Sequence, residues 1–235
     1  MGDIIIALDF SEKQKMQNFL NNFQVGKKPV VKIGMELFYQ YGPALIKEVQ
    51  RQGFKIFLDL KLNDIPNTVE RGMFQIAKLG VQYTTVHALG GTEMMQAAIR
   101  GAQKGATSAN VNRPLVLAVT ELTSISEKVM HDEQNIDISM REQVESLINL
   151  SYKAGTDGVI CSALDLKELD GNFKNFKFIT PGIRPLGFEK SDQKRVVTPT
   201  EARQFGSTDI VVGRPITRSN NPLKTYQQIF KEWSK

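Results

Sequence analysis

Short apolar runs recur at regular intervals along this chain, and longer amphipathic segments separate them. The runs are rich in Val, Ile and Leu without strict alternation, as expected for parallel strands buried on both faces. Strands that alternate with helices in this way predict an α/β fold with a parallel sheet. The expected strands cover residues 3–9, 29–34, 55–60, 81–87, 114–120, 158–162, 176–182 and 209–213.

Eight strand-and-helix units in a chain of 235 residues favour a (β/α)8 TIM barrel, forming a single domain over residues 1–235. A doubly wound sheet is the main alternative, but no G-x-G-x-x-G pattern follows the first apolar run. Residues 122–138 form the one long irregular connection, which we expect to be a loop or a short helix over the barrel mouth.

Several helix ends carry local signals. Ser11 is a candidate N-cap for the first helix, and Pro66 stands near the expected start of the third. Gly53 and Gly80 follow helical segments at positions typical of the C′ residue. These residues predict where the polypeptide turns between helix and strand.

The composition excludes several classes of protein. The formal net charge is +5, but the basic residues are spread along the chain, so we do not expect nucleic-acid binding. Cys161 is the single cysteine, which excludes an internal disulfide and a cysteine-based zinc site. Neither a secretory signal nor an apolar window of membrane-spanning length is present, so the expected location is the cytoplasm, with no membrane partner.

The segment FLDLKLNDIP, residues 57–66, places three charges at the end of an otherwise apolar strand. Side chains two apart on a strand share a face, so Lys61 points with Asp59 if the strand continues through it. Asp64 follows on the loop, and Lys32 ends the neighbouring strand. The alternating signs allow each charge an opposite neighbour, which favours a protonated Lys61 that can donate a proton. A salt-bridge network that only fastens the barrel is the alternative interpretation.

Two later segments have the character of a phosphate site. TPGIRP supplies Gly182 and Arg184, and VVGRPIT supplies Gly213 and Arg214, after the seventh and eighth expected strands. Glycine exposes backbone N–H groups, and arginine can bind an oxyanion through two hydrogen bonds. The corresponding loops of TIM barrels often bind phosphate. Turn glycines with solvated arginines would explain either segment alone, but less readily both together.

These motifs, in this order, resemble a known family. The segments ALDF, VKIGMELF, DLKLNDIPNTV, TVHALGG, AVTELTS, ITPGIRP, DQKR and TPTEARQFGSTDIVVGRPIT are similar to the shorter bacterial form of the orotidine 5′-monophosphate decarboxylase family over essentially the whole chain. Asn63 departs from the histidine that bacterial members often carry there, with little expected consequence. The resemblance implies a TIM barrel that converts orotidine 5′-monophosphate to UMP and CO2 in pyrimidine biosynthesis.

The resemblance also implies roles for individual residues. Asp59, Lys61 and Lys32 would form the catalytic network of one subunit, with Lys61 as the proton donor to C6 of the pyrimidine. Asp64 would be catalytic across the interface of a homodimer, in the partner's site, with Thr68 reaching the same ligand. The remaining substrate-binding residues would be Asp9 with Lys32 at the ribose, Thr123 at the pyrimidine, and Arg184, Gln193, Gly213 and Arg214 at the phosphate. No metal ion and no organic cofactor would be needed.

Two alternatives share parts of this pattern. Sister enzymes that resemble 3-keto-gulonate-phosphate decarboxylase or hexulose-phosphate synthase have the same D-x-K-x-x-D motif and use a divalent metal, held partly by an acidic residue on the second strand. Lys32 ends that strand here, and its ammonium would oppose metal binding. A non-catalytic barrel that only binds nucleotides would have no need for Asp59, Lys61, Asp64 and Lys32 together.

Overall fold

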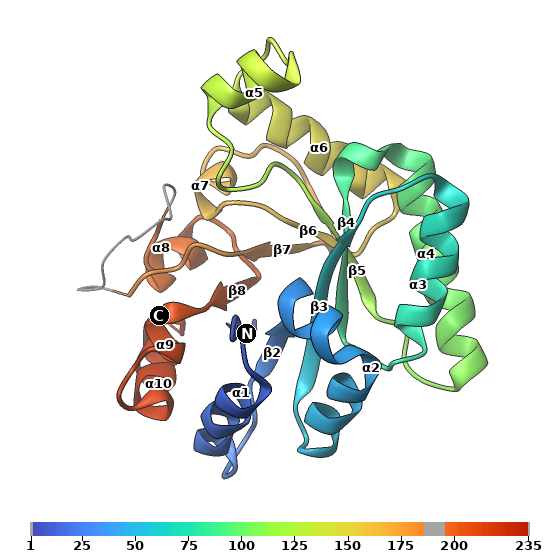
Figure 1. The fold of residues 1–235 in the computed structure, drawn as a ribbon. Helices are drawn as coiled ribbons and strands as arrows, with labels where there is room; N and C mark the ends of the chain where they lie inside the picture. Colours follow the sequence, from blue (N-terminus) through green and yellow to red (C-terminus); the bar gives the residue numbers. More distant parts are fainter. Residues whose placement is uncertain (1, 186–195, 235) are drawn as a thin grey trace.

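The computed structural model describes residues 2–185 and 196–234, and their strands close into a parallel barrel (Figure 1). Each strand pairs with the next in the sequence, and β8 pairs with β1, which closes the sheet. The predicted TIM-barrel architecture is therefore confirmed. The strands are β1 Ile4–Ala7, β2 Val30–Ile33, β3 Lys55–Leu62, β4 Tyr83–His87, β5 Leu115–Val119, β6 Gly158–Ile160, β7 Lys177–Thr180 and β8 Asp209–Val212.

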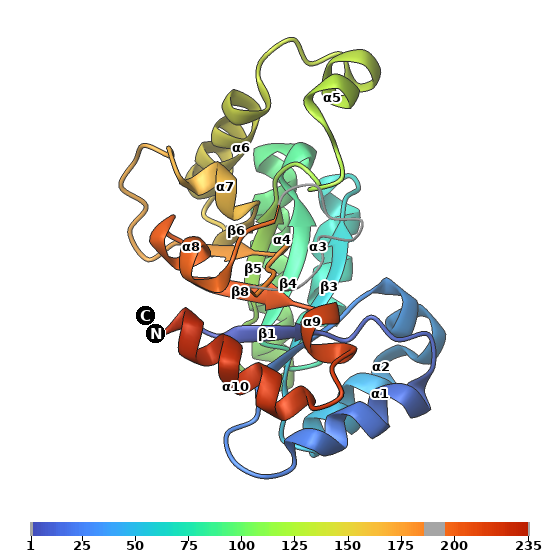
Figure 2. The same cartoon turned by 90° about the vertical axis from the view of Figure 1, so that its left-hand side faces the viewer.

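Helices surround the barrel on its outer side (Figures 1 and 2). Short helical turns η1 Asn21–Phe23 and η2 Ala88–Gly90 accompany them. The helices are α1 Lys13–Leu20, α2 Met35–Arg51, α3 Pro66–Ala77, α4 Gly91–Ala109, α5 Glu127–Gln134, α6 Met140–Ala154, α7 Ala163–Leu166, α8 Pro199–Gln204, α9 Arg214–Thr217 and α10 Pro222–Trp233.

The strands separate two apolar layers. Ile5, Phe57, Tyr83 and Leu117 belong to a buried cluster made only of strand residues, which fills the barrel interior. Their sequence neighbours face outward; Ile4, for example, packs in the larger cluster that includes the helices. Both faces of the sheet are thus buried, which explains why the strands appear as continuous apolar runs.

Most helix-end predictions agree with the structure. Pro66 occupies the first turn of α3, and Gly53 and Gly80 have left-handed φ angles of 87° and 68° just beyond α2 and α3. Ser11 is not the N-cap of α1, because the helix begins at Lys13 with Glu12 as an N-cap that makes no side-chain capping bond. Ser162, the last residue of a predicted strand, is an N-cap that was not predicted: it caps α7 by accepting a hydrogen bond from the Leu164 N–H.

The connection 122–138 contains α5, so the short-helix alternative applies. Ser126 caps this helix, and the Glu127 carboxylate accepts a hydrogen bond from the Met140 N–H at the start of α6. Figures 1 and 2 show α5 at the outer end of α6, away from the barrel strands.

Helices α3 and α4 pack unusually closely. A Cβ atom on Gly101 would come within 2.2 Å of the Glu70 carbonyl oxygen, and one on Gly105 within 2.2 Å of the Phe74 carbonyl oxygen. Glycine at these two positions therefore lets α4 approach the α3 backbone directly. Of the helices in residues 2–185 and 196–234, none combines the length and apolarity that a bilayer span requires.

Candidate active site

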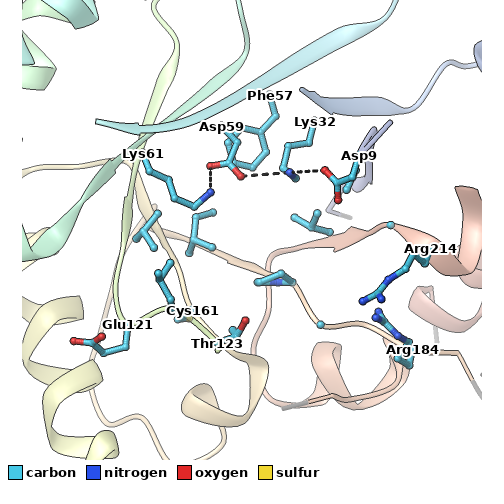
Figure 3. Close-up of a pocket in the computed structure, with 18 residues that line it drawn as sticks. Asp9, Lys32, Phe57, Asp59, Lys61, Glu121, Thr123, Cys161, Arg184 and Arg214 are labelled. Carbon is cyan, nitrogen blue, oxygen red and sulfur yellow. Dashed lines mark hydrogen bonds and ion pairs between the residues drawn. The ribbon is translucent and has the colours of Figure 1, made fainter. Parts of the chain in front are cut away.

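A cavity of about 260 Å³ opens at the carboxyl ends of the barrel strands (Figure 3). A chain of four charged side chains lines one wall, and Arg184 and Arg214 lie toward its Asp9 end, farthest from Lys61 in the view. Much of the remaining lining is apolar and includes Val119, Leu122 and Ile160. The cavity therefore combines a charged wall, an apolar lining and a cationic end.

The charged wall alternates in sign from Asp9 to Lys61. Lys32 Nζ lies 3.4 Å from Asp9 Oδ1 and 3.4 Å from Asp59 Oδ2, and Lys61 Nζ lies 2.9 Å from Asp59 Oδ1. The side chains of Lys32 and Asp59 are 14% and 11% exposed, whereas that of Asp9 is 67% exposed. Sequence analysis placed Asp64 in this chain of charges; in the structure Asp9 occupies the outer position instead.

The ion pairs keep these buried groups charged. Burial by itself raises the pKa of Asp59, but the ammonium groups of Lys32 and Lys61 and hydrogen bonds from Lys61 and Thr85 outweigh it, so the pKa lies below its ordinary value of 3.8. Burial lowers the pKa of Lys32, and the carboxylates of Asp59 and Asp9 more than offset this effect, leaving the pKa above 10.5. Asp59 is therefore a carboxylate and Lys32 an ammonium near neutral pH.

Lys61 stands on an irregular part of β3. The strand runs to Leu62 and not to Leu60 as predicted, and its register with β4 shifts between Leu58 and Leu62. Lys61 has a φ angle of 53°, in the left-handed region that non-glycine residues rarely occupy. The Lys61 backbone N–H donates to Thr85 Oγ1 at 2.9 Å, which anchors this bulge to the neighbouring strand.

Among the predicted site residues that the structure describes, Asp64 and Thr68 do not line the cavity of their own chain. Both are exposed, and Asp64 Oδ1 accepts a hydrogen bond from the Ile65 N–H. The backbone leaves the barrel after Leu62, so Asp64 sits on the β3–α3 loop, outside the Asp59–Lys61 pair.

The predicted anion-binding residues lie in the loops after β7 and β8. Gly182, Arg184, Gly213 and Arg214 all line the cavity, and Figure 3 labels both arginines in the same part of the view. The Arg184 N–H donates to the Val197 carbonyl oxygen at 2.9 Å, which ties the two ends of this loop together. The predicted phosphate ligand Gln193 lies outside the described residues.

Residues at the ends of β4 and β5 complete the surroundings. Thr123 lines the cavity as expected. Glu121, which sequence analysis did not single out, also lines it; the residue is 4% exposed and accepts a hydrogen bond from Gln143 Nε2 at 3.2 Å. Burial and the Lys61 ammonium lower the pKa of His87 below 6.5, so its imidazole is neutral near pH 7. The apolar sequence before His87 did not show that Lys61 and Glu121 would lie near this side chain.

Sequence reasoning also missed Thr85. This residue is fully buried, and its hydroxyl donates to Asp59 Oδ1 at 3.0 Å while accepting the Lys61 N–H. The sequence shows only a threonine within an apolar strand. Nothing local to that strand indicates which residues it faces.

The donor set does not suit a divalent metal. Within residues 2–185 and 196–234, no three His, Cys, Asp or Glu side chains are grouped as metal ligands. Asp59, the most buried carboxylate of the charged wall, has the ammonium groups of Lys32 and Lys61 where metal-binding neighbours would be needed.

Comparison with known proteins identifies the family of this chain. Residues 2–229 match the model of the family described as orotidine 5′-phosphate decarboxylase / HUMPS. The chain belongs to this family. It is similar to proteins named orotidine 5′-phosphate decarboxylase from Lactobacillus delbrueckii subsp. bulgaricus, with 51% identity over 99% of this chain and 97% of the relative, and from Enterococcus faecalis, with 50% identity over 98% and 97%.

A solved structure shows that the similarity extends to the fold. The crystal structure of orotidine 5′-phosphate decarboxylase from Lactobacillus acidophilus superposes with a TM-score of 0.88, at 45% identity and with full coverage of both chains. This family relationship therefore extends over the whole barrel and includes every strand end that lines the cavity.

Proposed function

We propose that this chain is an orotidine 5′-phosphate decarboxylase of pyrimidine biosynthesis, which releases CO2 from orotidine 5′-monophosphate and yields UMP. The observation that carries this proposal is the buried Asp59 carboxylate held between the Lys32 and Lys61 ammonium groups, in a cavity that two arginines also line. Family membership and relatives of about half-identical sequence support it. A single catalytic domain in the cytoplasm is part of the same proposal.

The cavity orients a nucleotide from its phosphate end. The dianionic phosphate binds Arg184 and Arg214, with the backbone of Gly213 and the side chain of Gln193 as further ligands. A Cβ atom at Gly213 would lie 3.5 Å from Ala7 Cβ and 3.9 Å from Asp9 Oδ2, so glycine keeps this wall open.

The ribose and the base then lie along the charged wall. Asp9 and Lys32 hydrogen-bond to the ribose hydroxyls, and Thr123 contacts the pyrimidine. This order follows the cavity from its cationic end toward Lys61 (Figure 3). Binding energy from the remote phosphate is thereby used to hold C6 of the base next to the Lys61 ammonium.

The chemical step breaks the bond between C6 and the carboxylate carbon. The carboxylate leaves as CO2, and the bonding electron pair stays on C6 in an orbital that lies in the ring plane. The Lys61 ammonium stabilises this developing charge, and a fixed charge in a site with little water needs little reorganisation. Lys61 then transfers a proton to C6, and the resulting neutral amine regains a proton from water.

Asp59 has two roles in this mechanism. Its carboxylate holds Lys61 Nζ at 2.9 Å, and it also faces the position of the substrate carboxylate. Repulsion between the two carboxylates is relieved as CO2 departs, which lowers the barrier by destabilising the bound substrate. The depressed pKa of Asp59 keeps it ionised for this purpose.

A homodimer with shared sites is the second part of the proposal. Asp64 and Thr68 are exposed and reach across to the partner's site, where Asp64 acts as a catalytic carboxylate. Ile65, the residue after Asp64, is 66% exposed, and Leu89 of η2 is 49% exposed, so apolar surface is available for a partner. A second hollow, lined by Met35 and its neighbours, opens beside the charged wall and offers room for a partner's loop.

The catalytic assignment is tested by the fall in pyrimidine absorbance when orotidine 5′-monophosphate is added. Lys61→Ala is expected to lose at least about 1,000-fold in kcat, because both the electrostatic contact and the proton donor are removed. Lys55→Ala is the control, since Lys55 is exposed at the opposite end of the same strand. Lack of turnover by the natural sequence, or full turnover by Lys61→Ala, would overturn the proposal.

The shared site is tested by mixing two inactive variants, Lys61→Ala and Asp64→Ala, and allowing their subunits to exchange. A heterodimer would contain one site with both residues intact, so about a quarter of the natural activity should return in an equal mixture. A mixture that stays inactive although sedimentation shows heterodimers would refute the role of Asp64 across the interface.

A further inference from the structure

Thr85 contacts the charged wall through Asp59 and Lys61 but does not itself line the cavity. It is in the middle of β4, two residues after Tyr83, whose side chain fills the barrel interior. Thr85 is completely buried. Its hydroxyl bridges two groups of β3, the Asp59 carboxylate at 3.0 Å and the Lys61 backbone N–H at 2.9 Å.

The direction of each hydrogen bond follows from the chemistry of the partners. A backbone N–H can only donate, and an ionised carboxylate can only accept. The Thr85 hydroxyl must therefore accept from Lys61 and donate to Asp59. Only a side chain that both donates and accepts can make this bridge.

The bridge bears on the least regular part of the barrel. The ladder between β3 and β4 is interrupted between Leu58 and Leu62, and Lys61 adopts a left-handed φ of 53° in the interrupted stretch. A buried N–H left without a partner is costly, and the Thr85 hydroxyl supplies the acceptor that the bulge withdraws from the ladder. The same hydroxyl fixes the carboxylate oxygen that receives Lys61 Nζ at 2.9 Å.

We propose that Thr85 is a positioning residue, which sets the Lys61 ammonium for proton transfer by holding both its backbone and its carboxylate partner. This inference rests on the proposed decarboxylase function. Thr85 does not contact the substrate in this scheme. Its loss should thus lower kcat and leave the binding of the nucleotide nearly unchanged.

The chain offers a closely matched control. Thr84 is the adjacent residue and is also fully buried, but its hydroxyl has no hydrogen-bond partner among the described residues. Thr84→Val and Thr85→Val make the same change in shape and polarity, one residue apart. Only the second removes the bridge to β3.

The experiment compares kcat, KM and the binding of UMP for Thr85→Val, Thr85→Ser and Thr84→Val. Thr85→Val should lose roughly 10- to 100-fold in kcat, because a small displacement of Lys61 weakens the transition state, with KM and UMP affinity within about twofold. Thr85→Ser keeps a hydroxyl and should recover most of kcat, and Thr84→Val should behave like the natural protein. Equal kcat in both valine variants, or a fall in Thr85→Val that serine does not rescue, would overturn the proposal.

Two further measurements keep the outcome decisive. If Thr85→Val does not fold, Thr85→Cys replaces it. Its thiol is a weak donor and acceptor, so its kcat should be lower than that of Thr85→Ser and of the natural protein but still measurable. A crystal structure of Thr85→Val or Thr85→Cys needs no turnover and should show Lys61 leaving the left-handed region or Nζ moving from Asp59. A bulge that is unchanged in that crystal structure would refute the positioning role, whether or not the natural protein decarboxylates the nucleotide. If the natural protein is active and Thr85→Val is unaffected, the positioning role is refuted and the proposed function stands.

Discussion

Lys32 provides an internal comparison between a buried and an exposed ion pair. Its ammonium lies 3.4 Å from both Asp59 and Asp9, but the Asp59 side chain is 11% exposed and that of Asp9 is 67% exposed. Replacing each carboxylate with the isosteric amide, Asp59→Asn and Asp9→Asn, therefore removes one charge at the same distance from the same cation. The two carboxylates differ in burial and in partners, because Asp59 also holds Lys61 Nζ at 2.9 Å and accepts a hydrogen bond from Thr85.

The magnitudes follow from Coulomb's law. At an effective dielectric constant of about 20, Asp59 attracts Lys32 and Lys61, the latter at 2.9 Å, by about 5 and about 6 kcal/mol respectively before desolvation is counted. Desolvation offsets much of this, and breaking a buried pair costs about 3 kcal/mol net because two ammonium groups lose their shared partner. Asp9 is largely hydrated, so its loss should cost less than about 1 kcal/mol.

The assay is urea unfolding at neutral pH and fixed protein concentration, followed by the fluorescence of Trp233, the single tryptophan, which is 1% exposed. Asp59→Asn should lower the free energy of unfolding by about 3 kcal/mol, or the melting temperature by roughly 6–12 °C. Asp9→Asn should remain close to the natural protein. Equal losses in the two variants, or a more stable Asp59→Asn, would refute the claim that the buried carboxylate between two ammonium groups contributes more than the exposed one.

Three other predictions use different parts of the structure. Because the pKa of Asp59 is depressed, its contribution to stability should be complete above about pH 4 and disappear as the pH falls through the folded-state pKa. The raised pKa of Lys32 should preserve its contribution until the pH rises beyond 10.5. Asp59→Asn should therefore reduce the loss of unfolding free energy at acid pH, and Glu70, Glu142 and Glu201, whose pKa values are also lowered, should supply the remainder. Gly105→Ala should destabilise the protein by about 1–2 kcal/mol, because its Cβ meets the Phe74 carbonyl oxygen at 2.2 Å, whereas Gly72→Ala meets nothing closer than 3.6 Å and should be neutral or slightly stabilising in the same urea assay. Turnover should survive treatment with EDTA, and a loss that added Mg²⁺ restores would contradict cofactor-free decarboxylation.

The sequence was sufficient for the barrel because its signals are local. An apolar run bounded by polar residues predicts a strand wherever it pairs, and a parallel strand must place its carboxyl end at the mouth. Asp59, Lys61 and Lys32 could therefore be assigned to one face before any contact was known. The N-cap of α1 was predicted at Ser11, which is wrong by one residue: the helix begins at Lys13 with Glu12 as its N-cap. Local patterns place a helix end only to within one or two residues.

The resemblance to a known family added what local patterns lack. The order of the motifs predicted the decarboxylase family, and the family match over residues 2–229 confirms that membership. It also predicted that Asp64 serves another subunit. Asp64 is exposed and lies outside the cavity of its own chain, and its role in a partner's site stays a prediction.

By itself the sequence determined the eight-stranded barrel, the face on which chemistry occurs and the charges that gather there. Only the tertiary structure decided that Asp9 ends the chain of charges, that Lys61 stands on a left-handed bulge, and that Thr85 from another strand holds it. The physical reason is that strand ends follow from the local period of apolar residues. Which side chains meet across strands depends on register, and register is set only when the whole barrel closes.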